Sequence, residues 1–280
     1  MNYDFGKYNL HTHSFYCGHG IGTLKEYVNQ AKKNKIELLG FSEHCPVKGD
    51  RWGSSRMDYD TKELYLADID SLKESEQNED DQIKILSGFE CDYFKEYDSY
   101  LSELKEKCDY LIFGVHYLNL PTYKDFPLHH YPLNSKALNI YTDQYIKSLE
   151  SNLFSLAAHP DLFFIQYFKW DNQAKAISKE IIEAAIYYDI PLEVNGNGIM
   201  KNQIKGFNND MRNVYPVKEF WQLAKSYDKL KIISNTDAHS PYNIKESFEK
   251  CDQFGKELSL EYSKANIDNI EKNHKVEFVK

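Results

Sequence analysis

The first chemically informative stretch of the sequence is His11-Thr12-His13. In an extended strand successive side chains point to opposite faces, so two histidines two positions apart project from the same face. Two neighbouring imidazoles form half of a metal site, because neutral imidazole is a common ligand of transition metals. A single His-x-His motif is weak evidence, and it gains weight only if similar residues recur at equivalent places along the chain.

Histidines recur at the ends of later apolar runs, together with two acids, Glu90 and Asp237. Seven of the ten histidines lie at the end of a predicted strand or in the loop just past it: His11, His13, His19, His44, His116, His159 and His239. At any one position a structural, hydrogen-bonded histidine is the alternative. The whole set predicts a multinuclear metal centre in which Glu90 bridges two ions, and ligands without thiolate suit zinc, iron or manganese.

Seven short apolar runs separated by longer amphipathic stretches predict how these residues are positioned. The predicted strands are 8–13, 37–42, 84–89, 110–115, 153–158, 191–194 and 231–235, and the predicted helices include 23–35, 60–75, 174–188 and 217–226. Thr23, with Glu26 three residues later, predicts a capped helix start. Alternation of strand and helix predicts a parallel sheet with right-handed crossovers. In a parallel barrel the carboxyl ends of all strands meet on one face, which would bring the histidines together.

The connection 119–139 contains three prolines and is predicted to be a long irregular insert, which either covers a site or is a divergent loop. His129 and His130 within it, and His274 near the C-terminus, are interpreted as surface or loop residues. The chain has no internal repeat and no low-complexity linker, so residues 1–280 are predicted to form a single domain.

The composition limits the partners. A net charge of −9 argues against nucleic acid and anionic membranes, because both need a cationic surface. A small anionic substrate remains compatible, since metal ions can supply positive charge locally. The five cysteines show no CxxC spacing and no apolar leader is recognisable in residues 1–5, so reduced thiols and a cytoplasmic location are expected. No apolar run is long enough to cross a bilayer.

The motifs together resemble the PHP (polymerase and histidinol phosphatase) superfamily, and within it the monofunctional histidinol-phosphate phosphatases. The resemblance covers nearly the whole chain and rests on His11-Thr12-His13, Cys17-x-His19, Phe41-Ser42-Glu43-His44, Gly88-Phe89-Glu90, Gly114-Val115-His116, Ala158-His159-Pro160-Asp161 and Thr236-Asp237-Ala238-His239. It implies an α/β fold of the distorted TIM-like (β/α)7 barrel type and a metal-dependent phosphatase.

The resemblance also implies how three divalent ions would be held. His11, His13, Glu90 and Asp237 would bind the first ion, Glu90 with His116 and His159 the second, and His19, His44 and His239 the third. Within this centre, Glu90, Asp237 and His239 would be the catalytic residues.

The implied reaction is the hydrolysis of L-histidinol phosphate to L-histidinol and phosphate, a step of histidine biosynthesis, by a hydroxide that bridges two of the ions. Asp161 and Glu43 are candidates for protonating the leaving group, or else for orienting a histidine. Relatives often carry arginines after strands five and six to bind the phosphate. Here Lys201 and Arg212 are the candidate substrate-binding cations, with an ordinary surface charge as the alternative for each.

Three other functions are compatible with these residues. A PHP-type phosphoesterase could act on a nucleotide, a phosphotyrosine or another small phosphate ester. An amidohydrolase-type barrel also opens with His-x-His, but such barrels typically have eight strands and often a carboxylated lysine. A metal-binding or regulatory barrel without catalysis is the non-enzymatic hypothesis.

Overall fold

The computed structural model describes residues 1–208 and 210–280, and its centre is a seven-stranded parallel sheet that is nearly closed into a barrel. In sheet order the strands are β12 (Ile232–Asn235), β9 (Leu192–Asn195), β8 (Leu156–Ala157), β5 (Tyr110–Phe113), β4 (Lys84–Cys91), β3 (Leu38–His44) and β2 (Tyr8–Asn9). All seven predicted strands are confirmed, although β2 and β8 are only two residues long. The predicted (β/α)7 barrel is therefore confirmed.

Asparagine side chains and one isolated backbone bridge, rather than a regular ladder, close the barrel between β2 and β12. The Leu10 amide donates to Asn235 Oδ1 at 2.8 Å, and the Thr236 amide donates to Asn9 Oδ1 at 3.0 Å. The His13 amide donates to the Ala238 carbonyl at 2.9 Å. These bonds bring the first and last strands together and place His13 next to the segment that carries Asp237.

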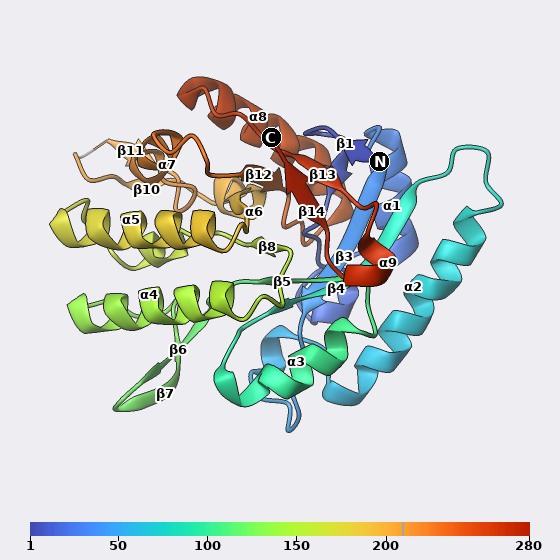
Figure 1. Cartoon of the computed structure of the whole chain (residues 1–280), viewed down its shortest axis with the longest axis horizontal. Coiled ribbons are helices and arrows are strands. Elements are labelled where there is room, and N and C mark those ends of the chain that lie inside the picture. Colours follow the sequence, from blue (N-terminus) through green and yellow to red (C-terminus); the bar gives the residue numbers. More distant parts are fainter. Residues whose placement is uncertain (209) are drawn as a thin grey trace.

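Helices surround the sheet (Figure 1). They are α1 (Leu24–Lys33), α2 (Lys62–Glu76), α3 (Asp98–Lys105), α4 (Ser135–Glu150), α5 (Asn172–Tyr187), α7 (Lys218–Lys225) and α8 (Ile244–Leu258), with the short α6 (Gly196–Met200) and α9 (Ile270–Asn273). The four predicted helices are confirmed as α1, α2, α5 and α7. Thr23 and Glu26 form the predicted capping box at the start of α1. No helix in the described part of the chain is both long and apolar enough to span a bilayer.

A second small sheet covers one end of the barrel. It consists of β1 (Asn2–Tyr3), β13 (Lys264–Asn266) and β14 (Glu277–Val279), so the two ends of the chain lie close together (Figure 1). Its Phe278 packs edge-on against Tyr8, which begins β2, at a ring-centroid distance of 6.2 Å. Because this sheet closes the end at which the strands begin, the end at which they finish remains available for a site.

The segment 119–139 is not an irregular insert, and that prediction is wrong. Its first part belongs to an antiparallel hairpin of β6 (Tyr117–Leu120) and β7 (Tyr123–Pro127), and its end forms the start of α4. The hairpin extends from the body of the molecule beside α4 (Figure 1). Proline demotes a strand prediction, but in a two-stranded hairpin Pro121 can occupy the turn and Pro127 the strand end.

A second hairpin, β10 (Ile204–Lys205) and β11 (Met211–Arg212), precedes α7.

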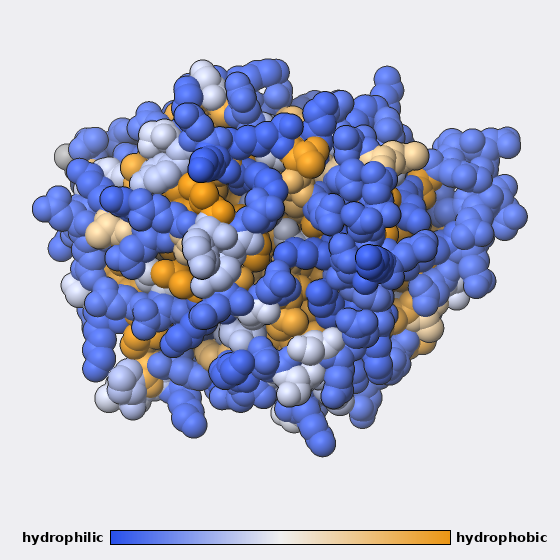
Figure 2. Space-filling model, viewed as in Figure 1, coloured by the Kyte–Doolittle hydropathy of each residue, from blue (hydrophilic) through white to orange (hydrophobic). Residues whose placement is uncertain are grey.

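The face of the molecule seen in Figure 2 is mostly hydrophilic, with apolar side chains visible mainly between the helices. The five cysteines are buried, and none is paired with another within the described residues.

Candidate active site

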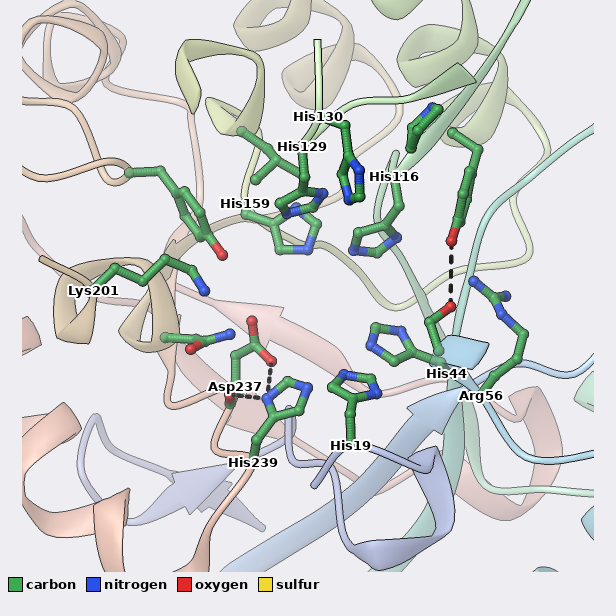
Figure 3. Close-up of a pocket in the computed structure, with 16 residues that line it drawn as sticks. His19, His44, Arg56, His116, His129, His130, His159, Lys201, Asp237 and His239 are labelled. Carbon is green, nitrogen blue, oxygen red and sulfur yellow. Dashed lines mark hydrogen bonds and ion pairs between the residues drawn. The ribbon is translucent and has the colours of Figure 1, made fainter. Parts of the chain in front are cut away.

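All nine predicted metal ligands lie together at the carboxyl ends of the strands. His19, His44, His116, His159, Asp237 and His239 line a pocket of about 430 Å³ (Figure 3). His11, His13 and Glu90 are buried directly behind this wall. The structure therefore brings together residues that are up to 228 positions apart in the sequence, from His11 to His239.

Glu90, at the end of β4, is the residue around which the imidazoles gather. Its two carboxylate oxygens lie 2.9–3.5 Å from a ring nitrogen of each of five histidines: His11, His13, His44, His116 and His159. Oε2 faces the first three of these histidines and Oε1 faces the last two. A carboxylate with a separate set of nitrogens at each oxygen has the arrangement of a bridging ligand.

Asp237 completes a second group on the other side of His13. Its Oδ1 lies 3.2 Å from His13 Nε2 and 3.6 Å from His11 Nε2. The same oxygen lies 3.6 Å from Nδ1 of His239. His11, His13 and Asp237 each offer one ligand atom within 4.8 Å of the others, which is compatible with one shared ion.

His44 lies between the second and third predicted groups. It forms a potential metal-binding group with Glu90 and His116, and another with His13 and His239. Its ring centroid is also 5.3 Å from that of His19. His44 is thus shared by two candidate metal-binding groups.

The Cys17 sulfur lies near His19 and His239 and could serve as a ligand atom, although Cys17 was not among the predicted metal ligands. It accepts a hydrogen bond from the Gly20 amide at 3.0 Å. Burial, followed by the charge of Glu43, raises the pKa of the Cys17 thiol to about 12. The thiol is therefore protonated at neutral pH unless a cation displaces its proton.

The buried charges of this cluster depend on one another. Burial raises the pKa of Glu90, but the adjacent imidazoles, led by His116 and His11, outweigh it and hold that pKa well below its usual range. The same balance, now with His11 and His13, lowers the pKa of Asp237. Conversely, burial lowers the pKa of His13, but the nearby carboxylates of Asp237 and Glu90 outweigh this and raise the pKa to about 9. Without a cation, protons on imidazole thus compensate the buried carboxylates.

The nine predicted ligands together form a cluster that we call the cage. It has the features expected of a site that binds cations. Several of its buried atoms have no hydrogen-bond partner in the described residues, namely His11 Nε2, both ring nitrogens of His13, His44 Nδ1, His159 Nδ1 and Asp237 Oδ1. Unpaired buried polar atoms are costly and rare in folded proteins. A Cβ at Gly114 would lie only 2.6 Å from Glu90 Oε1 and 2.8 Å from His116 Cε1, so glycine keeps this space open. These residues fit divalent metal ions.

Two of the predicted ligands have a strained backbone. His159 has φ 30° and Asp237 has φ 48°, in the left-handed region that residues with a Cβ seldom occupy. Such conformations persist only where the surrounding structure imposes them, and they are concentrated at functional sites. Here the strain turns both side chains into the cage.

Two buried carboxylates that the sequence motifs did not single out hold the histidines in place. Glu193 Oε1 accepts a hydrogen bond from His11 Nδ1 at 2.9 Å, so that His11 Nε2 faces the cage. Asp92 accepts from His116 Nδ1 at 3.1 Å and from the His116 amide at 2.7 Å. Asp92 follows Glu90 by two residues, and this alternation was the available signal that it faces the site.

Replacing Glu193 with glutamine is expected to weaken metal binding by roughly 10- to 100-fold, because carboxylates that orient a ligating histidine have effects of this size. The affinity would be measured by competition with a coloured chelator. Glu183→Gln, on the exposed face of α5, is the matched control. Equal metal affinities for Glu193→Gln and the control would contradict the orienting role.

The two cations predicted to bind substrate differ in position. Lys201 lines the pocket. Arg212 does not, and its prediction as a substrate contact is corrected. Its guanidinium is buried and donates to the backbone carbonyls of Asn213, Val214 and Phe164. A lone arginine in a loop gives no sequence signal that separates this structural role from phosphate binding.

Arg56, in the loop after β3, is an arginine that does line the pocket. It is 4% exposed, lines the pocket, and leaves its Nε without a partner among the described residues. Its Nη2 lies 3.3 Å from Asp92 Oδ2, so its charge is shared with the carboxylate that holds His116. Arg56 and Lys201 approach the pocket from opposite sides (Figure 3).

His129 and His130 also line the pocket, although they were interpreted as surface or loop residues. They follow the β6–β7 hairpin, and the ring of His129 stacks on that of His116 with a centroid distance of 6.1 Å (Figure 3). The segment after the hairpin therefore covers one side of the site. His274, by contrast, follows α9 in the cap that closes the far end of the barrel, and its Nδ1 lies 2.8 Å from the Cys108 carbonyl.

Neither carboxylate considered as a proton donor lines the pocket. Asp161 is fully buried, and its Oδ2 accepts from the Val217 amide at 2.6 Å and from the Trp221 indole at 3.2 Å. Glu43 is fully buried as well, and its Oε1 accepts from both the amide and the hydroxyl of Ser14. Both residues position the segments that carry site residues.

Comparison with known proteins identifies similar chains. The model of the PHP domain family matches residues 9–197. Histidinol-phosphatase of Bacillus subtilis is 22% identical over 268 residues, which cover 85% of this chain and 96% of that protein. The crystal structure of histidinol phosphate phosphatase from Lactococcus lactis, complexed with zinc, L-histidinol and phosphate, superposes with a TM-score of 0.70 at 17% identity. That alignment covers 98% of this chain and 99% of the other.

Proposed function

Because the chain belongs to the PHP domain family, we propose that it is a metal-dependent phosphomonoesterase that hydrolyses histidinol phosphate to histidinol and phosphate. The observation that carries the proposal is the convergence of seven histidines, Glu90 and Asp237 around one pocket whose walls also bear Arg56 and Lys201. The curated relatives named as histidinol-phosphatases, which match over most of their length, support the choice of substrate.

Three divalent ions are proposed, held by the side chains that meet in the cage. The first would bind His11, His13, Glu90 and Asp237, the second would share Glu90 with His116 and His159, and the third would bind His19, His44 and His239. Divalent cations supply positive charge to phosphoryl oxygens and make water a nucleophile near neutral pH. Glu193 and Asp92 would fix the ring orientations of His11 and His116, so that the ligand nitrogens are already in place.

The residues of the pocket wall would bind the substrate. Arg56 and Lys201 bring positive charge to the phosphate from two sides, where a chain of net charge −9 would otherwise repel an anion. A volume of about 430 Å³ is suited to a small ester. His129 and His130 form the wall on the side of the β6–β7 hairpin, where they could contact the alcohol part of the substrate.

A substrate panel tests this function. The metal-loaded protein is expected to hydrolyse histidinol phosphate with a kcat/KM about 100-fold or more above those for p-nitrophenyl phosphate, a nucleoside monophosphate and phosphotyrosine, because a pocket built for one alcohol discriminates against others. An equal or higher kcat/KM for another ester would show that histidinol phosphate is not the preferred substrate and would assign the enzyme to the other substrate class. Absence of turnover with every ester would refute a phosphatase.

A further inference from the structure

Tyr215 differs from the other buried tyrosines of the barrel. Six fully buried tyrosines donate their hydroxyl to a backbone carbonyl: Tyr8, Tyr27, Tyr65, Tyr110, Tyr141 and Tyr145. Tyr215 is 3% exposed and lines the pocket, and its hydroxyl makes no hydrogen bond within the described part of the chain. The hydroxyl is also not among the atoms sealed from solvent, so it opens into the pocket. A phenol hydroxyl that opens into a pocket, with no hydrogen-bond partner in the described part of the chain, is free to donate to a molecule bound there.

The fold fixes Tyr215 from both sides of the loop between β11 and α7. Arg212 donates to the carbonyls of Asn213 and Val214 just before it, and Asp161 accepts from the Val217 amide just after it. Arg212 and Asp161 therefore both fix the conformation of the loop that carries Tyr215.

The tyrosine ring is seated between α6 and His159. A Cβ at Gly198 would overlap the Tyr215 ring, so a glycine is needed there for the ring to pack. On its other side the ring meets His159 edge-on, with a centroid distance of 6.0 Å. Lys201 follows Gly198 by three residues and lines the same pocket. One wall of the pocket thus carries a phenol, an ammonium group and a predicted metal ligand.

We propose that the Tyr215 hydroxyl donates a hydrogen bond to an oxygen of the phosphate group bound in this pocket. The inference rests on the proposed phosphatase function and deepens it by naming a further substrate-binding residue. A phenol ordinarily has a pKa near 10, so at neutral pH it carries the proton that this hydrogen bond needs. No arginine of the described residues after β8 or β9 lines the pocket, and a fixed phenol supplies a donor there instead.

The test is the binding of inorganic phosphate to the metal-loaded full-length protein, measured by titration calorimetry, for the wild type and Tyr215→Phe. Loss of a hydrogen bond to a charged group should weaken phosphate binding roughly 10- to 100-fold and lower kcat/KM for histidinol phosphate by a similar factor. Metal content should not change, because the hydroxyl has no hydrogen-bond partner to lose among the described residues. Tyr8→Phe, which removes a buried hydroxyl that donates to the Ser263 carbonyl at 3.0 Å, is the control and should leave phosphate binding unchanged.

Three results would overturn the inference. They are a phosphate affinity of Tyr215→Phe within about twofold of the wild type, a parallel loss of metal in that variant, and no phosphate binding by the metal-loaded wild type. The calorimetric readout needs no turnover. If the wild type binds phosphate but does not hydrolyse histidinol phosphate, the choice of substrate fails, while the effect of Tyr215→Phe on phosphate still decides the role of the hydroxyl.

Discussion

Glu90→Gln is expected to lose at least one equivalent of bound metal and to reduce kcat/KM for histidinol phosphate roughly 10³-fold. The substitution keeps the size of the side chain and removes its charge. Both oxygens of Glu90 face imidazole nitrogens, Oε1 at 2.9 Å from His159 and Oε2 at 3.0 Å from His44. An amide would present an N–H group where a ligand oxygen is needed and would leave the surrounding positive charge uncompensated, which in a buried site costs about 3–5 kcal/mol.

Elemental analysis and steady-state kinetics on the same preparation would measure both effects. Glu103→Gln, on the exposed side of α3, is the control for removal of one negative charge. Metal content and kcat/KM of Glu90→Gln close to those of the control would show that Glu90 does not bridge ions.

Removal of metal by a strong chelator is expected to abolish hydrolysis and to lower the midpoint of thermal unfolding by about 10 °C. A ligand present at 1,000 times its Kd stabilises the folded state by about 4 kcal/mol, and 1 kcal/mol corresponds to about 2–4 °C in a domain of this size class. The physical source is the cage itself. Several of its buried atoms, such as His13 Nε2 and Asp237 Oδ1, have no hydrogen-bond partner among the described residues.

Calorimetry of the loaded, chelated and reloaded protein would measure this shift, and reloading should restore both the midpoint and the activity. A chelated protein, shown to be metal-free, that keeps its unfolding midpoint and its activity would contradict a structural and catalytic role of the ions.

The convergence of the nine proposed ligands could be predicted from the sequence because the barrel gives these residues a simple order. Each predicted ligand follows a short apolar run, and parallel strands bring their carboxyl ends to one face whatever their separation in sequence. The location of His11 and Asp237 in one site could therefore be predicted without knowledge of their tertiary contacts. The confirmed capping box of Thr23 and Glu26 is a local signal of the same kind.

The pocket wall could not be predicted in this way, because its residues depend on tertiary packing. Arg56 and Arg212 are both isolated arginines in loops, and only the fold shows that one lines the pocket while the other bonds to backbone carbonyls. Tyr215 looks like any core tyrosine until its unpaired hydroxyl is seen. The β6–β7 hairpin was missed because prolines weaken a strand signal. His129 does lie in the turn after this hairpin, but nothing in the sequence indicates that the turn faces the pocket.

Metal quantification combined with anomalous diffraction tests the central claim most directly. The account predicts close to three equivalents of divalent metal per chain, with anomalous density between Glu90, Asp237 and the seven surrounding histidines. An active protein that contains no stoichiometric metal, or density at some other place in the molecule, would contradict it.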